Sequence, residues 1–455
     1  MFHHSQTQGF PRGTALTGFA GIGALLLTAC GGPVASPEDG GGLGTAEEHV
    51  QITMMSNDAF AQTWQDQLVP EFNKKYPYID VTIDSTPYDS LLAKGLLNGT
   101  SPDPDYDLIT LDDPWTPQLA DSGLLLELKD DAAEWTADDY DWDDFNSAPL
   151  AAGEWDEGQY GVPLRSNLLL MLYNKDLYQK AGLPEPTADL TWDQYMSQAP
   201  KLVQDTDGDG SVDSWATGLT WARGVLSPPF WQTVLNSNGG ELFDGDMTPS
   251  FNTPEGERAL QTQVDLLKYA PSGASTYNYT EPLDAFRQGK VATLFTWGSA
   301  YRSAAVDPEV TTLAPEQVGI QTMPAGSEGP GAHRGIWSGA VFKNSDKPEA
   351  AWTFLQWMSS KEGELWASNN LGSFPARKST LSAQPEEKWL APVYAATQAG
   401  FDVAASGEMW RPRAVDSNAI QEILANETSA AVQGEKSAGE ALEKADEQIR
   451  DLPGK

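Results

Sequence analysis

The segment Ile52-Thr-Met-Met-Ser56 opens the stretch of sequence that decides the fold. It is short and mostly apolar, which is typical of a buried strand. Apolar side chains then recur at every fourth position, the spacing of one helix face: Phe60, Trp64, Leu68 and Phe72. A strand followed directly by an amphipathic helix is the unit from which open α/β sheets are built.

The same alternation continues along the chain. Residues 81–83 and 107–111 have the pattern of strands, and residues 88–97 between them that of a helix. Residues 168–173 are apolar throughout, as in a strand that is covered on both faces. Later strands are expected at 291–295, 318–323 and 339–342. We therefore predict an α/β fold with open, mainly parallel sheets.

The predicted helices have recognisable ends. A helix over 175–181 should close at Gly182, and Thr191 should cap the helix that follows it. The end of the chain is expected to form two helices, at 417–431 and 438–450.

The amino terminus has the pattern of an export signal. Arg12 precedes a small and apolar run that is about half as long as a membrane-spanning helix. Leu27-Thr-Ala-Cys30 resembles a bacterial lipobox, which implies diacylation of Cys30, the one cysteine of the chain. The alternative is an accidental cysteine at an ordinary cleavage site. We predict a signal peptide over 1–29 and a flexible leash over 30–47.

Charge and composition exclude several classes of function. The chain has 65 acidic and 28 basic residues, a net charge of −37, so binding to nucleic acid is not expected. A lone cysteine forms no intramolecular disulfide, and four histidines offer little to a zinc site. The chain lacks the serine-hydrolase, zinc-protease and phosphate-loop signatures, and we expect no enzyme.

Several longer segments resemble the sugar-binding solute receptors of ABC importers, in order, over about residues 50–450. The segments that carry the resemblance are Tyr173-Asn-Lys-Asp-Leu-Tyr-Gln-Lys-Ala-Gly-Leu183, Phe286-Arg-Gln-Gly-Lys-Val-Ala-Thr-Leu-Phe-Thr-Trp-Gly298, Gly335-Ile-Trp-Ser-Gly-Ala-Val341, Lys347-Pro-Glu-Ala-Ala-Trp-Thr-Phe-Leu355 and Phe374-Pro-Ala-Arg377.

This resemblance implies a two-lobed fold of the periplasmic-binding-protein type, with a ligand cleft between lobes. It places residues 48–166 and 297–334 in one lobe, and residues 167–296 and 335–455 in the other. It also implies a monomeric receptor, lipid-anchored on the extracytoplasmic face of the bacterial membrane. Such a receptor captures a carbohydrate by hinge closure and delivers it to the membrane subunits of an ABC permease.

Polar candidates for the cleft follow predicted strands or flank lobe crossings. Asp58 and Asp113 follow strands, where parallel sheets bind ligands, although each could instead cap a helix. Arg165 and Asn167 flank the first crossing, where a maltodextrin receptor carries a carboxylate at the place of Asn167. Arg165 could instead form a structural ion pair. Arg377 is a further candidate, with a salt bridge between lobes as its alternative.

Sugars stack on aromatic side chains, so tryptophans outside helix faces are candidates. Trp297 ends a strand at a lobe crossing, and its counterpart in maltodextrin-binding relatives stacks on sugar. Trp337 lies at the next crossing. Trp221, Trp231 and Trp410 lie in loop-like surroundings, and packing in the core is the alternative for all of them.

An Asp-Gly-rich segment resembles the start of a calcium-binding loop. Its oxygen ligands would be Asp205, Asp207, Asp209 and Asp213. Ala216 stands where such loops carry a bidentate glutamate, so a solvated acidic turn is the alternative. We expect no other cofactor.

Three other functions stay open from the sequence. A receptor of the same kind could bind a non-sugar solute such as a peptide or polyamine. An exported glycoside hydrolase would need two facing carboxylates, and no pair is distinguished. A surface module organised by Ca²⁺ would rest on the acidic loop alone.

Overall fold

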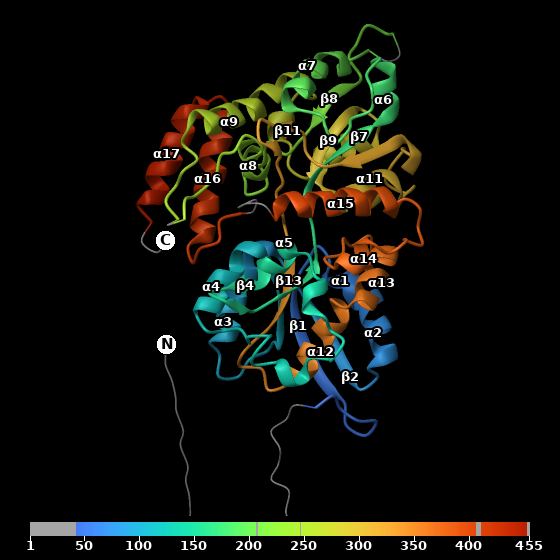
Figure 1. Ribbon diagram of the computed structural model, residues 1–455, viewed down its shortest axis with the longest axis vertical. Coiled ribbons are helices and arrows are strands. Elements are labelled where there is room, and N and C mark those ends of the chain that lie inside the picture. Colours follow the sequence, from blue (N-terminus) through green and yellow to red (C-terminus); the bar gives the residue numbers. More distant parts are fainter. Residues whose placement is uncertain (1–41, 206–207, 246, 406–410, 453–455) are drawn as a thin grey trace, which may run out of the picture. The chain divides into compact units, whose positions relative to one another are not determined.

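The computed structural model describes residues 42–205, 208–245, 247–405 and 411–452. In this part of the chain, strands form a five-stranded and a four-stranded sheet, each with helices on both faces (Figure 1). We call the five-stranded sheet with its helices the first lobe, and the four-stranded sheet with its helices the second lobe. The two-lobed α/β fold predicted from the sequence is confirmed.

The sheet of the first lobe has the order β2-β1-β3-β13-β6. Strand β1 pairs in parallel with β2 and β3, whereas β13 is antiparallel to β3 and β6. The strands are β1 (Val50–Asn57), β2 (Ile79–Thr86), β3 (Leu108–Asp112), β6 (Val162–Arg165) and β13 (Trp337–Val341).

The helices of the first lobe cover both faces of this sheet because side chains alternate along its strands. Ile52 and Met54 of β1 pack on α2 and α12, and Met55 faces α3 and α4. The helices are α1 (Ala61–Thr63), α2 (Val69–Lys75), α3 (Tyr88–Gly99), α4 (Thr116–Asp121), α5 (Ser147–Leu150), α12 (Pro348–Met358), α13 (Lys361–Leu371) and α14 (Lys378–Leu381).

The sheet of the second lobe has the order β10-β7-β9-β8. Only β8 and β9 pair in parallel, since β7 is antiparallel to β9 and β10. The strands are β7 (Leu169–Asn174), β8 (Trp215–Gly218), β9 (Val291–Trp297) and β10 (Val318–Gln321). The prediction of mainly parallel sheets was therefore wrong, and both sheets are mixed.

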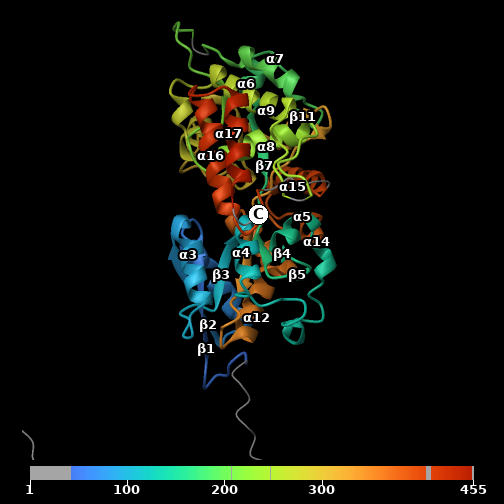
Figure 2. The ribbon, with the colours of Figure 1, turned by 90° about the vertical axis from the view of Figure 1, so that its left-hand side faces the viewer.

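Helices of the second lobe bury β7 from both sides, as its apolar run predicted: Leu170 and Leu172 face one apolar cluster, and Met171 and Tyr173 the other. Figure 2 shows α16 and α17 side by side, and both contact α9. The helices are α6 (Lys175–Lys180), α7 (Trp192–Leu202), α8 (Pro228–Ser237), α9 (Pro254–Leu266), α10 (Thr280–Arg287), α11 (Tyr301–Ala305), α15 (Leu390–Ala404), α16 (Ser417–Val432) and α17 (Ala438–Arg450).

Strand pairing corrects the lobe limits implied by the resemblance. Strand β10 was expected in the first lobe but pairs with β7 of the second, and β13 was expected in the second but pairs with β3 and β6. The chain therefore returns to the first lobe between residues 321 and 337. It reaches the second lobe again at α15, which packs with Leu170 and Leu172.

The four remaining short strands form two hairpins, β4 (Glu154–Trp155) with β5 (Gly158–Gln159), and β11 (Ala325–Gly326) with β12 (Gly329–Pro330).

Candidate functional site

A groove of about 570 Å³ lies where residues of both lobes meet. Asn57 ends β1, Arg165 ends β6 and Trp297 ends β9, so the groove forms at the carboxyl ends of strands. Trp337 joins them from the beginning of β13 because that strand is antiparallel. The described residues that line it are Asn57, Asp58, Ala59, Phe60, Tyr88, Asp112, Arg165, Asn167, Val225, Leu226, Tyr279, Trp297, Ser299, Gly335, Trp337 and Arg411.

Aromatic side chains of the first lobe form one wall of the groove. The Trp337 ring is met edge-on by Phe60, with centroids 5.2 Å apart, and by Tyr88 at 6.0 Å. Trp115, fully buried below them, contacts Trp337 at 5.8 Å and 89°. This packing fixes the plane of the ring of Trp337, one of the predicted ligand residues, at the groove.

Trp297, a predicted ligand residue, contributes an aromatic face to the groove from the second lobe, although the resemblance had placed it in the first. A Cβ atom on Gly335 would lie 2.7 Å from Cζ3 of Trp297, so only glycine lets the backbone pass this close to the ring. On the same ring packs His333, with centroids 5.8 Å apart. Burial lowers the pKa of His333 well below its ordinary value, so the imidazole is neutral at pH 7.

The polar floor of the groove contains Asp112, which ends β3. Its carboxylate accepts hydrogen bonds from both terminal nitrogens of Arg411 and from the Tyr88 hydroxyl at 2.8 Å. Burial raises the pKa of Tyr88, so this hydroxyl stays protonated and acts as a donor. The Nε–H of Arg411 is buried and has no acceptor among the described residues.

Asp113 was expected at the ligand and is not among the groove residues. It is 0% exposed and lies between two guanidinium groups, 3.2 Å from Arg334 Nε and 3.2 Å from Arg413 Nη1. It also begins the 3₁₀ turn after β3. The carboxylate that reaches the groove is therefore its neighbour Asp112.

Arg165, Asn167 and Asp58, three of the predicted ligand residues, line the groove. The Asn167 side-chain amide forms hydrogen bonds with the segments where the chain crosses between lobes. It donates a hydrogen bond to Ser299 Oγ at 2.9 Å and accepts hydrogen bonds from the backbone amides of Ser299 and Leu168 at 3.1 Å each. The Asp58 carboxylate is exposed. The Arg165 guanidinium lies over the face of Phe60, 5.6 Å from the ring centroid.

Trp221 and Trp231 are core residues, so their assignment to the ligand was wrong. Both are 0% exposed, and each indole N–H donates to a backbone oxygen at 3.1 Å, of Gln263 and Gly256 respectively. Their burial comes from helices distant in sequence, which a loop-like local pattern does not reveal.

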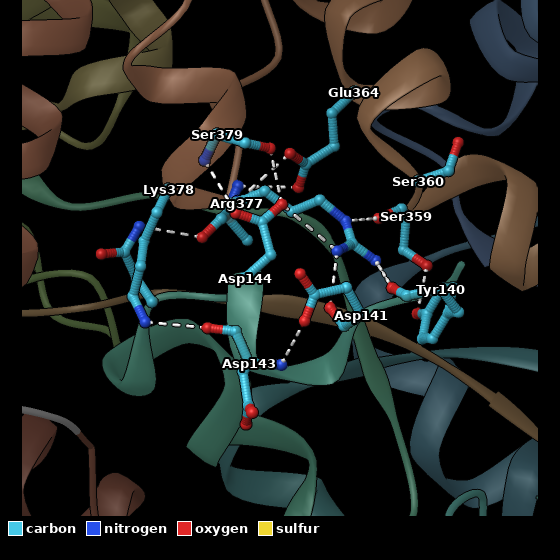
Figure 3. A network of polar contacts seen from close by, with 12 residues as sticks. Tyr140, Asp141, Asp143, Asp144, Ser359, Ser360, Glu364, Arg377, Lys378 and Ser379 are labelled. Atoms are coloured by element: carbon cyan, nitrogen blue, oxygen red, sulfur yellow. Dashed lines mark hydrogen bonds and ion pairs between the residues drawn. The ribbon is translucent and has the colours of Figure 1, made fainter. Parts of the chain in front are cut away.

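Arg377 is also structural, and it binds within the first lobe instead of bridging two lobes (Figure 3). Its guanidinium donates to the backbone oxygens of Tyr140, Asp141 and Ser359 at 2.7–2.8 Å, and it stacks on Phe145 at 4.0 Å. It lines a separate hollow of about 600 Å³. The described residues that line that hollow all belong to the first lobe or to the segment before it.

The acidic loop after α7 is described only in part. Asp205 accepts three backbone hydrogen bonds, from the amides of Gly208, Asp209 and Gly210, at 2.6–3.2 Å. Asp207 lies outside the described residues, as do Trp410 and Cys30. Binding of Ca²⁺ therefore stays a prediction.

Sequence reasoning missed several groove residues, chiefly Phe60, Tyr88, Tyr279 and Ser299. Phe60 was assigned to a helix face, and its ring does pack there, although one edge reaches the groove. Arg411 and Asp112 line the groove and adjoin the predicted ligand residues Trp410 and Asp113.

Comparison with known proteins places this geometry in a family. Residues 57–365 match the family of bacterial extracellular solute-binding proteins. A putative binding protein of Brucella abortus is 25% identical over 337 residues, which cover 72% of this chain and 76% of the relative.

Two solved structures resemble both the sequence and the fold. A solute-binding protein of Agrobacterium radiobacter K84, in complex with ribitol, has a TM-score of 0.74 at 27% identity and covers 89% of this chain and 99% of its own. A solute-binding protein of Agrobacterium vitis S4 with bound D-mannitol has a TM-score of 0.71 at 25% identity, covering 88% and 97%.

In the part of the chain that the structure describes, no helix combines the length and the apolar character needed to cross a bilayer. The family match spans well over half of the chain and includes strands of both lobes. The protein belongs to the bacterial extracellular solute-binding proteins.

Proposed function

We propose that this protein captures a carbohydrate, an oligosaccharide or a related sugar or polyol, and delivers it to an ABC permease. The observation that carries the proposal is the groove, in which aromatic faces of both lobes, Trp297 and Trp337, lie among hydrogen-bonding side chains. Aromatic faces suit the C–H patches of sugars, and polar side chains suit their hydroxyls. The ribitol and mannitol complexes of similar proteins support this class of ligand.

Capture would work by closure of the two lobes. Because the groove is lined from both lobes, a ligand makes its full set of contacts only when the lobes are together, and it shifts the population toward that state. A permease can then distinguish the loaded receptor from the empty one by its shape.

The proposal includes a location. The sequence pattern of residues 1–29 and Cys30 supports export and a lipid anchor on the extracytoplasmic face of the membrane. The leash over 30–47 would let the receptor move between solvent and permease. Mass spectrometry of the exported protein, with and without Cys30→Ser, tests the anchor, which requires a diacylated residue 30 at the new amino terminus.

The groove argues against the hydrolase alternative. Hydrolysis of glycosides needs an acid and a second carboxylate at the scissile bond. Asp112 is committed to Arg411 and Tyr88, so Asp58 is the one groove carboxylate without such a partner among the described residues. A receptor for a non-sugar solute remains the second candidate, since Asp58 also suits a cationic ligand.

The function is tested by thermal unfolding of a soluble version that begins near Gly40, against sugars and polyols that include ribitol, mannitol and maltose. A ligand at a hundred times its Kd should stabilise the native state by about 2.7 kcal/mol. Trp297→Ala should abolish that shift because it removes the aromatic face of the second lobe.

Trp389→Ala is the matched control for this test. Trp389 is a partly buried tryptophan of the second lobe that stacks on Tyr301, outside the groove, and its loss should leave the ligand shift intact. If no carbohydrate raises the midpoint while a peptide or polyamine does, the sugar assignment is wrong.

A further inference from the structure

The Arg165 side chain is a cation of the groove that forms no ion pair with any described residue. It ends β6 and is half-buried, and it has no hydrogen bond or ion pair with another described residue. Its guanidinium carbon lies over the Phe60 ring, 5.6 Å from the ring centroid. That contact orients the planar group while leaving its N–H donors available.

The groups around Arg165 do not neutralise it. Burial lowers the pKa of Arg165, and the titratable group that acts on it is Tyr279, a neutral phenol whose own pKa is raised by burial. Arginine stays protonated at neutral pH regardless of such a shift. Asp112 is already neutralised by Arg411, and the Asp58 carboxylate is exposed to solvent.

A second donor in the same groove also lacks an acceptor. The buried Nε–H of Arg411 has no partner among the described residues, although the two terminal nitrogens bind Asp112. A buried donor without an acceptor costs free energy, and an unpaired buried charge costs more. Arg165, in contrast, is only half-buried and lines the groove, so a ligand there can supply an acceptor for its N–H donors.

We propose that the groove selects a carbohydrate that carries an oxyanion, a carboxylate or a phosphate, and that Arg165 binds this group. The guanidinium fork matches both oxyanions in a bidentate manner, whereas single hydroxyls of a neutral sugar give weaker bonds. The chain as a whole has a net charge of −37, so its outer surface repels anions. An anion-binding groove would therefore differ in charge from the rest of the surface. This inference rests on the proposed function.

The test compares matched ligands that differ in the charged group: glucose, glucuronate and glucose 6-phosphate, and likewise mannitol, mannonate and mannitol 1-phosphate. Calorimetry at low salt should show the charged member of a series binding at least roughly tenfold tighter than the neutral one. Glucuronate and mannonate distinguish a carboxylate ligand from a phosphate ligand. Inorganic phosphate and acetate should bind far more weakly, because they lack the carbohydrate.

Variants assign the preference to Arg165. Arg165→Gln should remove most of the preference for the charged ligand, so that the charged and neutral members of a series bind with similar affinity. Arg165→Lys keeps the positive charge but loses the planar guanidinium, so it should retain part of the preference for the charged ligand. This second variant keeps the test informative if Arg165→Gln fails to fold. Arg258→Gln, at an exposed guanidinium outside the groove, should behave as wild type.

The outcomes separate this proposal from the function on which it rests. Neutral sugars that bind as tightly as their acids and phosphates would overturn the proposal and leave sugar capture standing. A charge preference that survives in Arg165→Gln would overturn the role of Arg165. Binding of neither neutral nor charged carbohydrate would overturn the proposed function itself.

Discussion

At the scale of single residues, Glu364 of α13 combines burial with a titration near neutral pH. Its side chain is 6% exposed. The carboxyl group accepts hydrogen bonds from the backbone amides of Ala376 at 2.8 Å and Arg377 at 3.1 Å, and these two bonds fix the backbone just before α14 (Figure 3). Burial raises the pKa of Glu364 to about 7. A carboxyl group that resists ionisation in the native state penalises folding at high pH.

We predict that Glu364→Gln reduces the loss of stability between pH 5 and pH 8. The unfolded chain releases this proton near pH 4.5 and the native protein near pH 7, so wild-type stability falls across that interval. The contribution is about 3 kcal/mol. Urea unfolding at both pH values measures it for wild type and variant.

The control is Glu362→Gln on the same helix, where the carboxylate is exposed and pairs with Lys75. It should change the pH dependence little, since an exposed ion pair contributes little to stability. Equal effects of the two substitutions would show that burial of Glu364 does not set its pKa.

At the scale of elements, local patterns predicted strands and helices well because their causes are local. Thr191 caps α7 with Gln194 in the expected manner. The fourfold spacing of Phe60, Trp64, Leu68 and Phe72 has an unforeseen basis, since residues 64–68 form a π-helical turn that keeps all four buried on one face.

Strand order and direction could not be predicted from the same patterns. Strands β3 and β13 pair across more than two hundred residues, and nothing in either segment specifies the antiparallel direction. The site residues show the same difference between local and distant causes. Trp297 and Trp337 were found because strand ends are local features, whereas burial of Trp221 and Trp231 depends on distant helices.

The loop after α7 carries a prediction about calcium. If the loop binds Ca²⁺, millimolar CaCl₂ should raise the thermal midpoint more than MgCl₂ does, because flexible oxygen sites with several carboxylates favour the larger ion. Asp205→Asn should abolish the difference. A thermal midpoint that is the same in CaCl₂, MgCl₂ and EDTA would show that the loop is a solvated turn. Its shape would then come from the hydrogen bonds that Asp205 accepts from the amides of Gly208, Asp209 and Gly210.

At the scale of the whole molecule, ion pairs connect the lobes beside the groove. Arg413 precedes α16 of the second lobe, and its guanidinium binds Asp113 and the backbone oxygens of Ala151 and Glu154 in the first. Burial lowers the pKa of Arg413 to about 10, so it is charged at pH 7. These contacts stabilise the arrangement in which both lobes line the groove.

We predict that Arg413→Met shifts the ligand-free protein toward more open conformations. The change removes hydrogen bonds between lobes, while Asp113 keeps its ion pair with Arg334 and is not left unpaired. Small-angle X-ray scattering should show a larger radius of gyration without ligand. The apparent Kd should rise in proportion as the closed fraction of the ligand-free receptor falls.

Arg258→Met, which removes an exposed guanidinium of α9, serves as the control. An unchanged radius of gyration in Arg413→Met would mean that the contacts of Arg413 do not determine the separation of the lobes.

The neighbouring carboxylates at the end of β3 have an evolutionary consequence. Asp112 pairs with Arg411 in the groove, and Asp113 pairs with Arg334 and Arg413 outside it. Descendants of this gene can therefore acquire a new cargo by exchanging positions 112 and 411 together, while 113, 334 and 413 are inherited unchanged. Among diverging lineages, substitutions should covary within each set and drift independently between them, although the two aspartates are adjacent in the chain.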